Sequence, residues 1–199
     1  MSRSDARPPL QQRVAQAILD AAAEVLAARG DQASMNDVAA AAGVARATVY
    51  RYFTNRQALV DELADVAITA AGARLASARI DEVPPEEAIT RALRALVDVG
   101  APFLVVARER VQPDPEKFER NLAVPLRRVI ERGQTEGILR ADLPAAWLAE
   151  SLVGLLVNIL SARPELDRED VVDAVSSLFL DGARRSDASG VIRRGRMGA

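Results

Sequence analysis

The chain has 199 residues, of which 49% are hydrophobic, 27% charged and 4% aromatic, a balance typical of a globular protein with one sizeable core or two small ones. It contains no cysteine and no histidine, which excludes disulfides, thiol nucleophiles, histidine general bases and zinc sites built from thiolate or imidazole ligands. Glycine-rich phosphate loops are also lacking. We therefore predict no catalytic activity, no cofactor and no metal site.

The formal net charge is -2, from 26 basic and 28 acidic residues, so the whole chain lacks the basic signature of a nucleic-acid binder. The charge is unevenly distributed, because residues 1–57 carry 7 arginines against 5 acidic residues. The longest apolar run, residues 147–160, contains Glu150 and Asn158 and is shorter than the roughly 20 residues of a membrane span. No signal peptide is visible, and we expect a cytoplasmic protein without a membrane segment.

The first predicted helix lies between a flexible arm, residues 1–9, and Gly30. Its apolar stripe recurs at three- and four-residue steps, at Leu10, Val14, Ile18, Ala21, Ala22, Val25 and Leu26.

Three further helix signals follow in the first third of the chain. Ser34 can cap a short helix that reaches Ala42, and Gly43 can end it in the left-handed conformation. After a tight turn, a second short helix is predicted over residues 46–52. Asn55 can cap a longer helix, whose buried stripe we expect at Leu59, Leu63, Val66 and Ala67.

Pro84 and Pro85, followed by two glutamates, predict a helix start after a break, and we place the domain boundary there. Further helices are predicted at about 85–100, 102–110, 115–136, 144–162 and 168–182, with Pro125 kinking or splitting the third. No stretch alternates with the period of a strand. The sequence thus predicts an all-α fold with an N-terminal domain at 10–70, a C-terminal domain at 84–183, and flexible tails at 1–9 and 184–199.

The two short helices joined through Gly43, residues 34–53, have the spacing of a helix-turn-helix motif. In such a motif the second helix enters the DNA major groove. There Arg46 can present a bidentate fork to guanine, Thr48 can contact thymine, and Ala47 permits close approach.

Other residues of the motif suit the DNA backbone. We expect Tyr50, Tyr52 and Arg56 to contact phosphates, with Arg56 reinforced by the positive end of the fourth helix. Ser34 and Asn36, at the start of the first helix of the motif, complete the predicted DNA-binding set. Two alternatives stay open: the exposed Arg51 is either solvated or a DNA contact, and the tyrosine rings can also pack against the first helix.

Residues 13–63 resemble the N-terminal domain of the TetR family of transcriptional regulators. The skeleton that carries the resemblance is Gly43-Val44, Thr48-Val49-Tyr50, Phe53 and Leu59. The resemblance implies a homodimer, DNA contacts from residues 46–52, and release of double-stranded operator DNA when a small molecule binds. The family often has Ser or Thr at the position of Ala45, Gly at that of Ala47 and Lys at that of Arg56, so the capping hydroxyl of the second helix is missing here.

The helix predicted at 144–162 is apolar on several sides, and the last helix carries a similar stripe. We predict that these two helices form a four-helix bundle between subunits, with internal packing of a monomer as the alternative. Their apolar residues include Leu148, Leu152, Leu155, Leu156 and Ile159, and then Val171, Val172, Val175, Leu178 and Phe179. The acidic run from Glu165 to Asp170 suits a helix start better than a metal site.

The middle helices of the C-terminal half offer apolar and aromatic surface for a small-molecule effector of apolar or weakly polar character. The residues expected to line its pocket are drawn from Phe103, Val106, Phe118, Leu122, Trp147 and Ser151. The sequence therefore favours a ligand-responsive regulator, most simply a repressor released from a palindromic operator. The alternatives are a helical carrier of small molecules without specific DNA recognition and an enzyme, although the spacing singles out no carboxylate pair.

Overall fold

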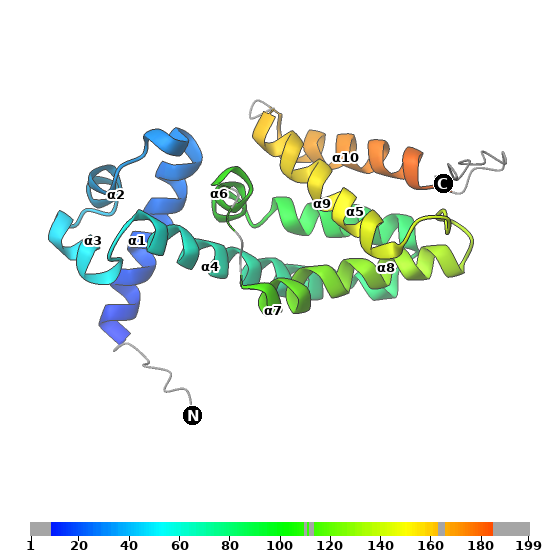
Figure 1. Ribbon diagram of the computed structural model, residues 1–199, viewed down its shortest axis with the longest axis horizontal. Coiled ribbons are helices and arrows are strands. Elements are labelled where there is room, and N and C mark those ends of the chain that lie inside the picture. Colours follow the sequence, from blue (N-terminus) through cyan, green and yellow to red (C-terminus); the bar gives the residue numbers. More distant parts are fainter. Residues whose placement is uncertain (1–8, 110, 112–113, 163–165, 185–199) are drawn as a thin grey trace, which may run out of the picture.

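The computed structural model describes residues 9–109, 111, 114–162 and 166–184. Within these residues the fold is all-helical apart from one isolated β-bridge between Leu139 and Arg184. Figure 1 shows two groups of helices connected by the long helix α4 (Arg56–Ser77). The all-α fold class predicted from the sequence is confirmed.

The first group contains α1 (Pro9–Arg29), the short helix η1 (Gly30–Gln32), α2 (Met35–Ala41) and α3 (Arg46–Tyr52). Gly30 and Gly43 end α1 and α2 with φ angles of 54° and 65°, a region that side chains with a Cβ atom rarely adopt. Asn55 caps α4 by accepting a hydrogen bond from the Ala58 amide at 2.8 Å. These local signals lie where the sequence predicts them.

The second group begins with η2 (Ile80–Glu82), α5 (Pro85–Val97) and α6 (Ala101–Glu109). It continues with α7 (Pro115–Phe118), the π-helical turn η3 (Glu119–Ala123), α8 (Val124–Thr135), α9 (Ala145–Ala162) and α10 (Arg168–Ala183). Pro125 lies in the first turn of α8, directly after η3. The predicted break therefore takes the form of a π-helical turn, which widens the backbone where proline removes an N–H donor.

Two apolar cores hold these groups together. The first core is built around Ile18, Val38, Val49 and Leu59, and the second around Leu93, Ile130 and Leu156. The cores divide inside α4, because Leu63 belongs to the first and Ile68 to the second. Val105 of α6 also lies in the first core. The predicted domain limits at 70 and 84 stay a prediction, but the packing already changes between residues 63 and 68.

Helix α9 is, by length and composition alone, the one helix in the described residues that could cross a membrane. It has 18 residues, more than the apolar run recognised in the sequence. In the fold it packs against α6, α8 and α10, and Leu148, Leu152 and Leu156 are buried in the second core. Its inner face is thus that of a helix packed within a protein.

The C-terminal tail predicted to start at residue 184 requires a correction. Arg184 donates a hydrogen bond from Nε to Glu86 at 2.8 Å and pairs with Leu139 in the isolated bridge. It is therefore fixed to α5 and to the segment that follows α8. Residues 1–8 and 185–199, the remainder of the predicted tails apart from Pro9 at the start of α1, lie outside the described residues.

Candidate nucleic-acid interface and effector cavity

The helix-turn-helix segment begins with a reciprocal cap at the start of α2. The Ser34 hydroxyl accepts a hydrogen bond from the Asp37 amide at 3.2 Å, and the Asp37 carboxylate accepts one from the Ser34 amide at 2.9 Å. Hydrogen bonds from the Ser34 hydroxyl and then its amide, together with Arg29 at 2.6 Å, hold the pKa of Asp37 below its ordinary value. Ser34 thus has a structural role, while Asn36 beside it is exposed.

Helix α3 is anchored by Val49, whose side chain is fully buried in the first core. The other faces of the helix turn outward: Arg46, Ala47 and Tyr50 are exposed and Thr48 is half-buried. No side chain caps the start of the helix, as expected with alanine at position 45. Ala47 therefore lies opposite the buried anchor, and Arg46, Thr48 and Tyr50 lie on the flanks of the helix.

Two arginines of α3 lie over tyrosine rings. The Arg46 guanidinium carbon is 5.2 Å from the centre of the Tyr50 ring, and that of Arg51 is 5.4 Å from the Tyr52 ring. Cation–π contacts of this kind hold a guanidinium in place without neutralising its charge. Tyr52 is half-buried and packs against the first core, and its hydroxyl stays a predicted phosphate contact.

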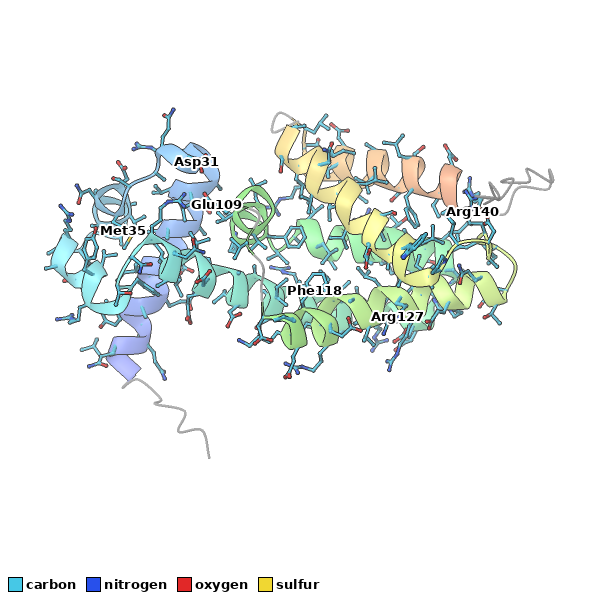
Figure 2. The ribbon with its side chains drawn as sticks, in the orientation of Figure 1. Asp31, Met35, Glu109, Phe118, Arg127 and Arg140 are labelled. Carbon is cyan, nitrogen blue, oxygen red and sulfur yellow. The ribbon has the colours of Figure 1, made fainter. Side chains whose placement is uncertain are left out.

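The phosphate contact predicted for Arg56 requires a correction, because the side chain is engaged within the protein. Its guanidinium donates two hydrogen bonds to the Glu109 carboxylate, at 2.8 and 2.6 Å, and a third contact reaches the Gly30 carbonyl at 3.4 Å. The side chain is half-buried between the two groups of helices, where Glu109 of α6 faces the first group (Figure 2). Sequence reasoning missed Glu109, because a partner 53 residues away leaves no local pattern.

A cavity of about 320 Å³ opens between the segment α7–η3–α8 and helix α9. We call it the α8–α9 cavity. Its lining consists of Phe118, Glu119, Leu122, Ala123, Leu126, Arg127, Ala146, Ala149, Glu150, Val153 and Gly154. Most of this lining is apolar, and Phe118 and Arg127 mark its wall along α7 and α8 (Figure 2).

The predicted pocket lining is corrected by this geometry. Phe118 and Leu122 line the α8–α9 cavity, but Phe103 is buried in the second core and Val106 is half-buried on α6. Trp147 is 61% exposed, and the exposed Ser151 donates its hydroxyl hydrogen bond to the Trp147 carbonyl. The sequence marks α9 as apolar on several sides and so does not show which side faces the cavity.

The charged groups that line the cavity differ in whether they have an ion-pair partner. Arg127 donates a hydrogen bond to Glu119 at 3.0 Å, so these two charges compensate each other. Glu150 is exposed and has no hydrogen-bond or ion-pair partner within the described part of the chain. One uncompensated carboxylate therefore lies beside apolar walls.

The wall of the cavity is also attached to α4. Lys117 pairs with Asp65 of α4. A Cβ atom placed on Gly72 would lie 2.8 Å from Cβ of Asn121 in η3, so the two helices approach more closely there than any other residue allows. A shift of η3 must therefore displace α4, the helix that follows α3 in the chain.

Comparison with known proteins completes this description. The family described as "Bacterial regulatory proteins, tetR family" matches residues 18–63. The repressor LfrR of Mycolicibacterium smegmatis is 31% identical over 181 residues, which cover 86% of this chain and 91% of that protein. The chain belongs to the TetR family. It is thus a helix-turn-helix transcriptional regulator, which favours the regulator over the carrier.

Two further similarities support this TetR-family assignment. The regulator NfxB of Pseudomonas aeruginosa is 26% identical over 76% of this chain and 85% of its own length. The crystal structure of LfrR from Mycobacterium smegmatis in complex with proflavine is 30% identical, covers 85% of this chain and 96% of that one, and superimposes with a TM-score of 0.69. These relatives are regulators rather than enzymes.

Proposed function

We propose that this TetR-family protein is a homodimeric cytoplasmic repressor that binds a palindromic operator and is released by a small effector with a largely apolar body. The observation that carries the proposal is the surface of α3, where Arg46, Ala47 and Tyr50 are exposed while Val49 is buried. A helix held from behind in this way can enter the major groove while its arginine reads guanine. We assign base contact to Arg46, Ala47 and Thr48, and backbone contact to Tyr50 and Tyr52.

Dimerisation through α9 and α10 is the second part of the proposal. Trp147 and Leu178, which are 61% and 60% exposed, are large apolar side chains on the outer faces of these helices. Leu156, by contrast, is fully buried within the protomer, which makes Leu178 the better site for a test of the interface.

The effector is proposed to occupy the α8–α9 cavity and to carry a single positive charge on an apolar body. The apolar lining and the uncompensated Glu150 support this class of ligand, since a carboxylate beside apolar walls attracts a cation that those walls can desolvate. The related LfrR was crystallised with proflavine. Proflavine is therefore a suitable first probe for this chain.

DNA binding is tested with a fluorescent fragment of the protein's own promoter. Specific binding should exceed binding to a scrambled fragment and should weaken steeply as salt rises, because phosphate contacts release counterions. Footprinting should reveal two half-sites about 34 to 36 Å apart, or a multiple of that spacing, since a two-fold dimer presents two recognition helices. Equal affinity for both fragments would favour the carrier.

Effector binding is tested by titrating proflavine and following its fluorescence. Glu150→Gln should weaken binding about tenfold, the usual effect of losing an interaction with a charged group. Glu24→Gln, which removes the same charge from the exposed face of α1, is the control and should leave proflavine affinity unchanged. Equal effects of the two variants would rule out the assigned role of Glu150.

A further inference from the structure

The ion pair between Arg56 and Glu109 joins the first residue of α4 to the last residue of α6. Both nitrogens at the end of the guanidinium donate to the two carboxylate oxygens, at 2.8 and 2.6 Å. Such a bidentate arrangement fixes the relative orientation of the two side chains as well as their separation.

The surroundings make this pair more than a surface contact. The Arg56 side chain is 34% exposed and that of Glu109 only 11%. The hydrogen bonds that Arg56 donates to Glu109 raise the pKa of Arg56 and outweigh the opposing effect of burial. Arg56 Nε is buried and has no hydrogen-bond partner in the described residues. The side chain is thus oriented so that its two terminal nitrogens reach Glu109 while Nε is left unpaired.

Both ends of the pair are attached to functional elements. Arg56 follows α3 by four residues, and the intervening Phe53 is buried in the first core. Helix α6 packs against α1 and α4 and also against α9, which forms one wall of the α8–α9 cavity. Glu109 thus lies at the end of a helix that touches both the cavity wall and the DNA-binding group.

We propose that Glu109 is a positioning residue for operator binding, which acts by holding Arg56 and thereby fixing α3 relative to the second core. The inference rests on the proposed function, because it needs a dimer whose two recognition helices fit successive grooves. Without the ion pair, the first group of helices gains freedom about α4. That freedom must be lost again when both half-sites are occupied, so operator affinity falls.

Single and paired variants test this role with the promoter fragment. Glu109→Gln and Arg56→Gln should each weaken operator binding about tenfold, within the range typical of coupling between sites. Arg56→Glu combined with Glu109→Arg should restore affinity to within about threefold, because the exchange rebuilds the pair. Glu169→Gln is the control: it breaks the bidentate pair of Glu169 with Arg94, which lies on the exposed surface between α10 and α5 within the second group, and should leave operator affinity unchanged.

The salt dependence separates positioning from direct DNA contact. A positioning role leaves the slope of log affinity against log salt unchanged in Arg56→Gln, whereas loss of a phosphate contact lowers it by about one. If Arg56 bound phosphate, Glu109→Gln would also tighten binding and the charge exchange would place a carboxylate against DNA. A lower slope, tighter binding or a failed exchange would each overturn the proposal.

Folding and function are separated by two additional measurements. Circular dichroism and thermal unfolding of each variant identify any that fail to fold, and a double-mutant cycle on unfolding measures the pair without DNA. A cycle without coupling overturns the proposal as well. If the wild-type protein bound no promoter DNA, the proposed function would be refuted. If the wild type bound normally and the variants bound equally well, only the positioning role of Glu109 would be refuted.

Discussion

The two groups of helices build their candidate functional surfaces in different ways. In the first group, the surface of α3 is set within about twenty residues by the Ser34–Asp37 cap, the left-handed Gly43 and the Asn55 cap. In the second group, the α8–α9 cavity is formed by residues 118–127 and 146–154, which only the tertiary fold brings together. A surface made by local signals can be recognised in the sequence, whereas one made by packing cannot.

The two groups also differ in how they meet. Helix α4 contributes to both cores, and α6 adds Val105 to the first. The ion pair of Arg56 with Glu109 connects the groups directly, and the close approach of Gly72 to Asn121 attaches η3 to the second-core half of α4. A change in the second group therefore has physical routes to α3, which a simple linker would not provide.

The largest expected effect is a loss of stability caused by a substitution in the core of the second group. Leu156→Ala should lower the free energy of unfolding by about 2 to 5 kcal/mol, because it removes a fully buried side chain and leaves a cavity. Urea denaturation followed by circular dichroism measures the loss. Leu10→Ala makes the same chemical change at a side chain that is 69% exposed, and it should have almost no effect. A similar loss for both variants would contradict the core described for α9.

The next effect concerns the recognition surface of the first group. Arg46→Ala should reduce the preference for operator over scrambled DNA by about 1 to 3 kcal/mol, because a bidentate contact with guanine is lost. Fluorescence anisotropy with both fragments measures this preference. Arg128→Ala, which removes an equal charge from the exposed surface of α8, should leave the preference intact.

Tyr50→Phe complements that experiment. Loss of a hydroxyl that touches phosphate should weaken binding to both fragments alike, since phosphate contacts carry no sequence information. If Arg46→Ala weakened operator and scrambled DNA equally, Arg46 would contact the backbone and not a base.

The helices of the first group illustrate what the sequence determines. The predicted recognition helix, residues 46–52, matches α3 because the glycine of the preceding turn and one apolar anchor are local features. Arg56 shows the limit of the same reasoning: the sequence identifies a cation at a helix start, but its carboxylate partner is 53 residues away. The sequence therefore identifies the cation at the helix start, but it does not predict the ion pair that this cation forms.

The second group shows a different limit. The sequence predicts its helices and the break at Pro125, because proline and helical periodicity act locally. It does not predict that Phe103 turns into the core while Trp147 turns outward. A helix that is apolar on several sides, such as α9, leaves its rotation to be decided by neighbouring helices.

A smaller effect tests the α8–α9 cavity without disturbing the recognition surface. Ala149 is buried on α9 and lines the cavity. Ala149→Phe should fill part of the cavity and weaken proflavine binding at least about tenfold. A mismatch of a single methylene group in an apolar pocket already costs about 1 to 3 kcal/mol of binding free energy. Operator affinity without proflavine should stay unchanged. Ala141→Phe, in the exposed segment before α9, is the control, and an equal loss there would exclude the cavity as the proflavine site.

The smallest effect concerns the cap of α2. Ser34→Ala should lower the free energy of unfolding by about 1 kcal/mol at pH 7, because one amide at the helix start loses its acceptor. The Asp37 pKa is lower in the folded protein than in the unfolded chain. Its stabilising contribution is thus present above the unfolded value of about 3.9 and is lost as the pH falls through the folded value.

The difference between Ser34→Ala and wild type in thermal unfolding should therefore shrink as the pH falls from the unfolded Asp37 pKa of about 3.9 through its lower folded pKa. Ser77→Ala is the matched control, because the Ser77 hydroxyl donates only to a carbonyl within α4, at 2.9 Å from Ala73. It should change stability little at either pH. A Ser34→Ala effect of constant size across this range would mean that the cap acts through the hydroxyl alone, without the Asp37 carboxylate, and that the first group depends less on reciprocal local bonds than its geometry indicates.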